Sequence, residues 1–145
     1  MDDMDDMDES PPVIRTQADL EQLWRTLMEP LGFTRTSVWM MLIDAEGAPV
    51  RQLVEIDEAH DPPDTDEREG FADLLRELVP DDGHRIAFLR TRPGRGGLTR
   101  KDRRWAQALY ATARSAGIAC EVVHVANDAR LVPVPLDELA LRRSA

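Results

Sequence analysis

Residues 85–126, RIAFLRTRPGRGGLTRKDRRWAQALYATARSAGIACEVVHVA, contain the pattern that predicts the fold class. Apolar segments of strand length at 85–89 and 118–126 flank a Gly-rich loop at 91–98 and a long helical pattern that ends before Gly117. A strand, a helix and a second strand in this order form a right-handed crossover with parallel strands. The stretch therefore predicts two parallel strands with one helix packed on their sheet.

The helix of this stretch has recognisable ends. Thr99 and Asp102 have the spacing of a capping box, in which each side chain accepts a hydrogen bond from the other residue's N–H. Gly117 favours the left-handed conformation that terminates helices. Five residues recur at helical spacing on the predicted inner face, namely Trp105, Ala108, Leu109, Thr112 and Ala116.

The rest of the chain predicts further elements around this unit. Helical spacing of apolar residues predicts two more helices, whereas Asp57–Glu69, with seven acids and two prolines, is expected to be a solvated loop. Alternating or apolar runs predict a hairpin around Asp44–Gly47 and a final short strand. The additional predicted elements are helices at about 16–29 and 67–79, strands at 37–44, 48–56 and 130–134, and a helical turn at 136–141.

The order of these elements, α-β-β-α-β-α-β-β, predicts a mixed sheet flanked by helices, in the α/β or α+β class. With 145 residues the chain has the length of one ordinary domain. Residues 1–12 are acidic and end in two prolines, a composition that predicts a disordered tail. We therefore expect a single folded domain at 13–145.

Charge is distributed unevenly along the chain. The net charge is −10, and residues 1–9 hold six acids and no base, whereas residues 85–104 hold eight bases and one acid, Asp102. Seventeen of the 18 bases are arginines, so a general preference for arginine also explains the second cluster. The acidic total argues against bulk binding to nucleic acid or to an anionic membrane, while the local cluster favours an acidic or anionic partner.

Composition also narrows the chemistry. A single cysteine, Cys120, excludes an intramolecular disulfide and fits a reducing cytoplasm, and no apolar run has the length of a membrane span or the form of a signal peptide. The histidines His60, His84 and His124 lack metal-ligand spacing, and both His124 and Cys120 fall in an apolar run typical of buried structural side chains. We expect no cofactor, although a carboxylate-bound Mg²⁺ stays open.

The loop between the strand and the long helix is the strongest candidate for a ligand site. Ligands in mixed α/β folds bind at the carboxyl ends of strands, and helix N-termini attract anions. The alternative is a solvated loop whose glycines serve only its turns, since neither the phosphate-binding nor the dinucleotide-binding glycine motif is present. The candidate anion-binding residues are Arg90, Arg92, Arg95, Thr99 and Arg100.

The region resembles the RadC-like branch of the JAB/MPN metalloprotease family. That family has His-x-His-Pro after a buried strand, then a Gly-containing loop, Ser or Thr, two residues and Asp, and next a long helix and a His-containing strand. The resemblance covers about residues 35–134 and implies a JAB/MPN, cytidine-deaminase-like three-layer architecture. The corresponding segments here are 44–47, 89–94, 99–102, 105–118, 122–125 and 130–132.

The resemblance also implies a zinc site, but the metal motif differs here. In the family two imidazoles and an Asp bind Zn²⁺, and these positions fall on Arg90, Arg92 and Asp102. A guanidinium stays protonated at neutral pH and cannot ligate a metal. We therefore expect a degenerate metal site without zinc and without a catalytic residue. The family's general-base Glu corresponds by position to Glu55 or Glu58.

Three functions follow, in order of preference. The first is a non-catalytic module that binds an acidic protein or another anionic ligand through its Arg-rich loop, with the segment 1–9 as a competing ligand of the same chain. The second is nucleic-acid binding, because RadC proteins carry a DNA-repair label. The third is a metal-dependent hydrolase that uses Asp102 with unconventional partners. A membrane partner is not expected, and the sequence leaves the oligomeric state open.

Overall fold

The computed structural model describes residues 13–80, 83–137 and 139, except for the side chains at 51 and 52. The predicted tail at 1–12 and part of the predicted turn at 136–141 lie outside these residues. Among the described helices, none combines the length and the apolar composition that crossing a bilayer requires. The elements are α2 (Gln17–Met28), β1 (Ser37–Ile43), β2 (Pro49–Asp57), α3 (Thr65–Leu78), β3 (Arg85–Thr91), α4 (Arg100–Ala116), β4 (Ala119–Cys120), β5 (Val123–Ala126) and β6 (Leu131–Val134).

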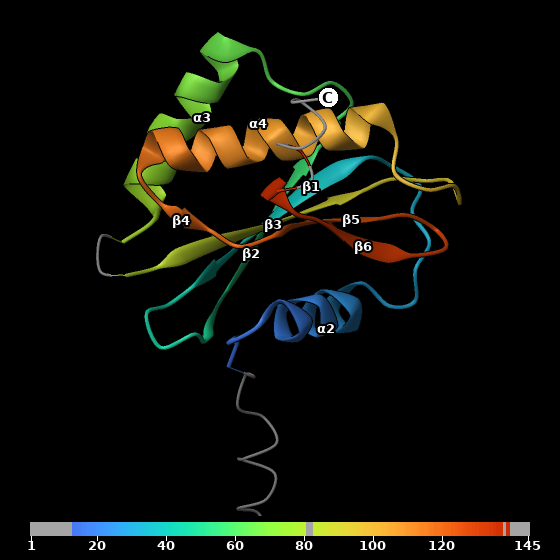
Figure 1. The fold of residues 1–145 in the computed structure, drawn as a ribbon, viewed down its shortest axis with the longest axis horizontal. Coiled ribbons are helices and arrows are strands. Elements are labelled where there is room, and N and C mark those ends of the chain that lie inside the picture. The colour runs from blue at the N-terminus through green and yellow to red at the C-terminus, as the bar shows by residue number, and fades with distance from the viewer. Residues whose placement is uncertain (1–12, 81–82, 138, 140–145) are drawn as a thin grey trace, which may run out of the picture.

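The strands form one mixed sheet in the order β2-β1-β3-β5-β6, and β4 also pairs with β3. The β3–β5 pair is parallel, as the crossover through α4 requires, whereas β1–β2, β1–β3 and β5–β6 are antiparallel. Helices α3 and α4 cover one face of the sheet and α2 covers the other (Figure 1). The prediction of a mixed sheet flanked by helices is therefore confirmed.

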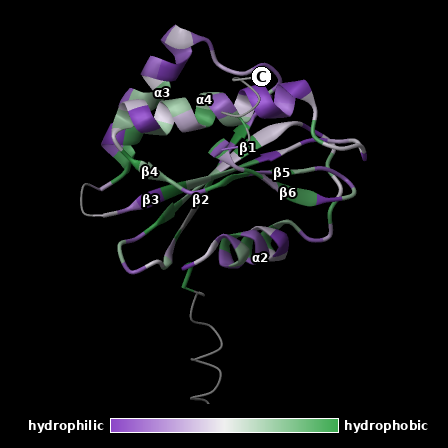
Figure 2. Ribbon diagram, in the orientation of Figure 1, coloured by the Kyte–Doolittle hydropathy of each residue, from purple (hydrophilic) through white to green (hydrophobic). Residues whose placement is uncertain are grey.

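Each face of the sheet carries its own hydrophobic core, because successive strand residues point to opposite faces. The core under α3 and α4 is built around Phe88, Leu109 and Val125, and the core under α2 around Trp24 and Leu89. Figure 2 shows hydrophobic residues along the strands, whereas the helices carry both colours, as expected of elements with one face toward solvent.

The strand predicted at 118–126 is interrupted, so that prediction is wrong in part. β4 and β5 both pair with β3, at its start and at its end, but residues 121 and 122 between them belong to neither strand. At this break Glu121 forms an ion pair with Arg85, and the N–H of Val123 donates to the Tyr110 hydroxyl at 2.9 Å. These contacts come from other elements, so apolar patterning along the strand does not reveal them.

Helix α3 begins earlier than its apolar pattern indicates. Asp64 and Glu67 form a capping box, so two acids that suggest a solvated loop in fact cap a helix. The apolar residues whose helical spacing predicts α3 do not all face the core, because Leu74 and Leu78 are each 48% exposed. The predicted capping box at the start of α4 is confirmed.

Candidate functional site

Alternation along β3 directs Arg90 toward α4. In the sheet Arg90 lies between Val38 of β1 and Val125 of β5, and both valines belong to the core under α3 and α4. Arg92 follows two residues later, and its N–H donates to the Ala126 carbonyl at 3.1 Å, which continues the parallel pairing past the end of β3. Because side chains two residues apart share a face of an extended chain, both arginines point toward the start of α4.

The side chains of Arg90 and Arg92 meet at Asp102, and we call these three residues the Arg–Asp–Arg triad. Arg90 Nε lies 3.1 Å from Asp102 Oδ1, while Arg92 donates from Nε to Oδ1 at 2.8 Å and from Nη2 to Oδ2 at 2.7 Å. The exposed fractions of the Arg90, Arg92 and Asp102 side chains are 3%, 14% and 0%. The triad is thus a largely buried ion cluster with two cations and one anion.

Arg90 also connects the triad to neighbouring segments. Its Nη1 donates to the backbone carbonyl of Ala59 at 2.6 Å, and its guanidinium carbon lies 5.5 Å from the centroid of the Trp105 ring. A cation at this distance from an aromatic face is attracted by the ring quadrupole. Arg90 therefore links β3, α4 and the connection between β2 and α3.

Asp102 is bound from several directions. Besides the two guanidiniums, it accepts the N–H of Thr99 at 2.8 Å, and the Thr99 hydroxyl accepts the N–H of Asp102 at 3.1 Å. Arg92 Nη2 also donates to the Gly97 carbonyl at 3.1 Å, which joins the middle of the loop to the triad. Both carboxylate oxygens are therefore occupied by N–H donors.

These contacts determine the charge states of the triad. Burial alone would raise the pKa of Asp102, but hydrogen bonds from Arg92, the Thr99 amide and Arg90 outweigh it and hold this pKa below its ordinary value. The hydrogen bonds that Arg92 donates to Asp102 raise the pKa of Arg92, whereas burial lowers the pKa of Arg90 against the opposing effect of Asp102. Asp102 is therefore an anion at neutral pH, with a protonated Arg92 beside it.

The triad does not fit the zinc ion that the family resemblance implies. Zinc in proteins takes thiolate, imidazole or carboxylate ligands, and guanidinium nitrogens offer no lone pair. The carboxylate of Asp102 is itself surrounded by N–H donors. Among the residues that the structure describes, no three His, Cys, Asp or Glu side chains are grouped so as to hold a metal.

Glu55 and Glu58, the two candidates for the family's general base, do not contact the triad. Glu55 pairs with Trp39 and accepts a hydrogen bond from the Ser37 hydroxyl at 2.7 Å, so its side chain lies on the α2 face of the sheet. Glu58 is exposed and adopts a positive φ of 56° directly before Ala59. Neither carboxylate has a hydrogen bond to Arg90 or to its partners.

The loop between β3 and α4 is held by the turn between β5 and β6. Asp128 accepts the N–H of Gly94 at 2.9 Å and the N–H of Phe33 at 2.8 Å, and Asn127 Nδ2 donates to the Gly96 carbonyl at 2.6 Å. Gly94 has a φ of +112°, a conformation that favours glycine. Three segments that are distant in sequence therefore meet at Asp128, and the loop has a defined shape.

Asp128→Ala is expected to loosen this loop, because both N–H donors lose their acceptor. Amide hydrogen exchange should become faster at Gly94 and at Phe33. The N–H of Thr99, which is bound by Asp102, should stay protected and serves as the internal control. Asp128→Asn keeps one carbonyl oxygen and should lose protection at one of the two amides; unchanged exchange in the alanine variant would contradict the assigned role.

The structure divides the five candidate anion-binding residues into two groups. Arg90 and Arg92 are engaged with Asp102, and the Thr99 hydroxyl accepts the helix-capping hydrogen bond, whereas Arg95 and Arg100 are exposed. Arg90 and Arg92 therefore do not form a surface for an external anion, because their donors are satisfied internally.

Four exposed arginines surround the loop, and we call them the basic rim. Two belong to the predicted set, Arg104 lies one turn after Arg100 on α4, and Arg130 lies in the β5–β6 turn beside Gly96 and Gly97. None of the four forms an ion pair with another residue of the described ranges. The sequence pattern does not relate Arg130 to the loop, because the two lie far apart along the chain; the residues that bring them together are Asn127 and Asp128, whose side chains bind the loop. The basic rim consists of Arg95, Arg100, Arg104 and Arg130.

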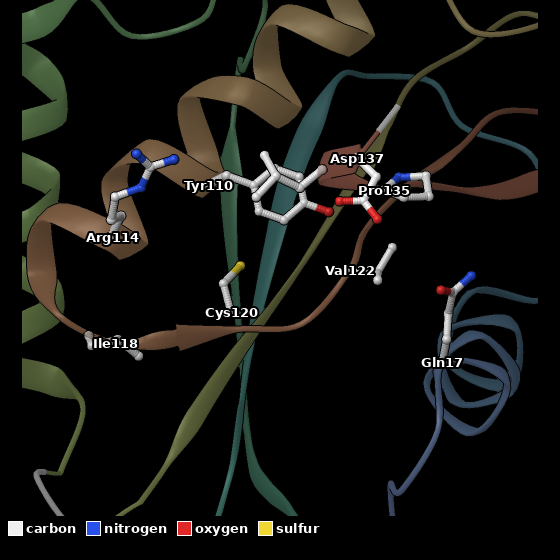
Figure 3. A pocket seen from close by; sticks show the side chains of 9 residues that line it. Gln17, Tyr110, Arg114, Ile118, Cys120, Val122, Pro135 and Asp137 are labelled. Carbon is white, nitrogen blue, oxygen red and sulfur yellow. The ribbon is translucent and has the colours of Figure 1, made fainter. Parts of the chain in front are cut away.

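A cavity of about 500 Å³ lies elsewhere, between the middle of α4, β4 and the segment after β6 (Figure 3). The Cys120 side chain points into it toward Tyr110, whose hydroxyl donates to the Val134 carbonyl at 2.8 Å. Burial raises the pKa of Cys120 to about 12, so this thiol is protonated at neutral pH. His124 lies on the opposite face of the sheet, so Cys120 and His124 do not form a nucleophile–base pair.

His124 is a buried residue of the α2 face. Its Nδ1 lies 3.0 Å from the Val122 carbonyl, and its Nε2 has no hydrogen-bond partner among the described residues and lies 3.9 Å from Glu21. Burial lowers the pKa of His124 below its ordinary value of 6.5, partly opposed by the Val122 carbonyl and Glu21, while Arg25 lowers it further. The folded protein therefore favours the neutral imidazole.

We expect His124 to make the fold sensitive to mild acid. A histidine whose pKa is lowered by folding binds protons more readily in the unfolded chain, so the free energy of unfolding should fall as the pH falls below about 6.5. His124→Leu should flatten this dependence in urea titrations between about pH 7 and pH 5. His60→Gln, at an exposed position, is the control and should keep the wild-type slope. Equal slopes for wild type and His124→Leu would contradict the expectation.

The chain matches no protein-family model, no curated protein and no solved structure, so comparison with known proteins assigns neither a family nor a function.

Proposed function

We propose that this chain is a non-catalytic module of the RadC-like JAB/MPN type, which binds an acidic partner through the basic rim. The proposal of the family is supported by the sequence pattern and by the order of the elements around β3 and α4. It is also supported by the meeting of Arg90, Arg92 and Asp102, the positions that the resemblance relates to metal ligands. The JAB/MPN, cytidine-deaminase-like architecture is part of this proposal.

The observation that carries the proposal is the Arg–Asp–Arg triad. In a zinc enzyme of this type a cation would join the strand end to the helix start. Here Arg90 and Arg92 join the same two elements through Asp102, and both oxygens of this carboxylate are held by N–H donors. The triad is therefore a structural substitute for a metal, and it supports the loop that carries the rim.

The rim is the proposed binding surface for an acidic partner, because its arginines are not engaged in ion pairs with any residue that the structure describes. Arg95 and Arg100 are exposed and have no ion-pair partner among the described residues, whereas the nearby Lys101 is paired with Asp61 at 3.1 Å. An acid, Asp61, lies beside the rim, since it pairs with Lys101 and is also influenced by the charge of Arg104, so a long polyanion such as duplex DNA would meet this carboxylate as well. A short acidic peptide can contact the rim and avoid that acid, so we favour an acidic protein segment over nucleic acid.

Charge reversal of the rim tests this function. We expect a fluorescently labelled hexa-aspartate peptide to bind the full chain at low salt, and Arg95→Glu/Arg100→Glu to weaken binding by about tenfold or more. Binding should weaken as salt is added, because exposed charges are screened over about 8 Å at physiological ionic strength. Circular dichroism should show an intact fold, since both side chains are exposed.

Arg114→Glu, at an exposed arginine at the far end of α4, is the matched control for Arg100→Glu alone, which makes the same change of charge. It should keep nearly wild-type affinity for the peptide. Equal weakening by Arg114→Glu would mean that net charge alone governs binding, and it would overturn the role of the rim. Tighter binding to a short DNA duplex than to the peptide, with a steep dependence on salt, would favour the nucleic-acid function instead.

A further inference from the structure

We propose that the acidic segment at residues 2–9 of one copy binds the basic rim of a second copy, which gives a salt-sensitive head-to-tail association. This inference rests on the proposed function, because it identifies the acidic partner of the rim as another molecule of the same chain. It is carried by two observations, namely where the acidic segment joins the fold and where the rim lies.

The acidic segment joins the fold at a fixed point. Ile14 is 1% exposed, its N–H donates to the Gly47 carbonyl at 2.7 Å, and Arg85 donates to its carbonyl at 3.3 Å. A Cβ at Gly47 would lie 2.9 Å from the Ile14 carbonyl oxygen, so glycine permits this close approach. The chain therefore enters the domain beside the β1–β2 turn and the start of β3.

The basic rim lies at the other end of the sheet. β3 runs from Arg85, next to the entry point, to Thr91, after which the loop with Arg95 begins. At about 3.3 Å per residue, the length of β3 alone separates the entry point from the rim by about 20 Å. The entry point is also on the α2 face, whereas Arg100 and Arg104 lie on α4, across the sheet.

This separation disfavours binding of the segment to the rim of its own chain. A chain spans at most about 3.6 Å per residue, so Glu9, four residues before Val13, reaches only about 14 Å and Asp8 about 18 Å. Asp2 reaches farther, about 40 Å at full extension, so only the part of the segment most distant from Val13 can lie on the rim of its own chain. In a second copy the distance along the chain sets no such limit, so all six acids can approach the four arginines.

The geometry also predicts the form of the association. The segment and the rim are different surfaces, so each copy uses one to bind and offers the other, which makes the interface heterologous. Such contacts extend into chains of molecules unless they close into a ring. The average mass should therefore increase with protein concentration beyond that of a dimer at low salt.

Sedimentation velocity of the full chain tests this inference. We expect the average mass to rise with concentration in about 20 mM NaCl and to return to that of the monomer in about 500 mM NaCl. Replacing the acids at 2, 3, 5, 6, 8 and 9 by their amides gives the tail-neutral variant, and Arg95→Glu/Arg100→Glu gives the rim-reversed variant. Each variant alone should remain monomeric.

Mixing the two variants provides the decisive result. The tail-neutral variant has an intact rim and the rim-reversed variant has an intact acidic segment, so an equimolar mixture should form a one-to-one dimer that cannot grow further. Failure of this mixture to associate, or association of the wild type that persists in the tail-neutral variant, would overturn the inference.

A separate measurement distinguishes failure of this inference from failure of the proposed function. The hexa-aspartate peptide is titrated into the tail-neutral variant, whose rim is intact. If the peptide binds but the mixture stays monomeric, the rim binds acidic partners other than this chain and only the inference fails. If the peptide does not bind, both fail.

Discussion

Asp102→Asn is expected to lower the free energy of unfolding by about 3–5 kcal/mol, the largest effect of any single substitution proposed for this protein. The substitution leaves the guanidiniums of Arg90 and Arg92 without a counter-ion in a site where their side chains are 3% and 14% exposed. The new amide also directs N–H groups toward N–H groups. Such a loss is a large part of the 5–15 kcal/mol that stabilises a typical domain.

The measurement is equilibrium unfolding in urea at neutral pH, with Asp61→Asn as the control. Asp61 pairs with Lys101 on the surface, with 86% of its side chain exposed, so its replacement should leave the midpoint almost unchanged. If both variants shift the midpoint equally, the triad has no special structural role. The proposal that the two guanidiniums take the structural place of a metal then loses its support.

The double variant Arg90→Met/Arg92→Met should be destabilised to a similar extent at neutral pH, but with the opposite dependence on acid. It leaves the carboxylate of Asp102 buried with only the Thr99 amide as a partner, and burial then raises the pKa of Asp102. An acid whose pKa is raised by folding binds protons in the folded state, so the variant should gain stability as the pH falls.

In the wild type the sign is reversed. The pKa of Asp102 is lowered, so its contribution is fully present above its ordinary value of 3.8 and is lost as the pH falls through its lower folded value. Urea titrations of both proteins between about pH 7 and pH 4 should therefore diverge in slope. Parallel slopes would show that the two guanidiniums do not control the charge of Asp102.

Arg90→Met alone is the informative control for the double variant. One cation and one anion remain, Arg92 and Asp102, so no buried charge loses its partner. The expected loss is about 1–3 kcal/mol, because the Ala59 carbonyl loses its donor and a buried group without a hydrogen bond is costly.

Local sequence rules predict much of this fold. The capping box of Thr99 and Asp102 and the glycine at 117 define α4 within a few residues, and both are features of neighbouring residues. Alternation in β3 also places the Arg90 side chain on the face that α4 covers. In each case the determining interaction lies within one turn or one strand, so the pattern of neighbouring residues is enough to predict it.

The chain pattern does not predict which groups satisfy one another across the fold. Arg90 is a candidate for an external anion until Asp102 and Ala59 are seen to take its donors. The break at 121 and 122 depends on Tyr110 and Arg85, which come from other elements. Which charges pair and where a strand is interrupted depend on which residues of different elements come close together in the fold. Composition alone does not indicate those contacts.

The carboxylate of Asp128 has a consequence for when the binding surface exists. Its hydrogen bonds to Phe33 and Gly94 span 95 and 34 residues of sequence, and closing such long loops is entropically costly, so these contacts are expected to complete late in folding. A nascent or partly folded chain would already carry the acidic segment, but its basic rim would not yet be ordered. A partner that recognises the rim therefore binds the fully folded domain in preference to a partly folded chain.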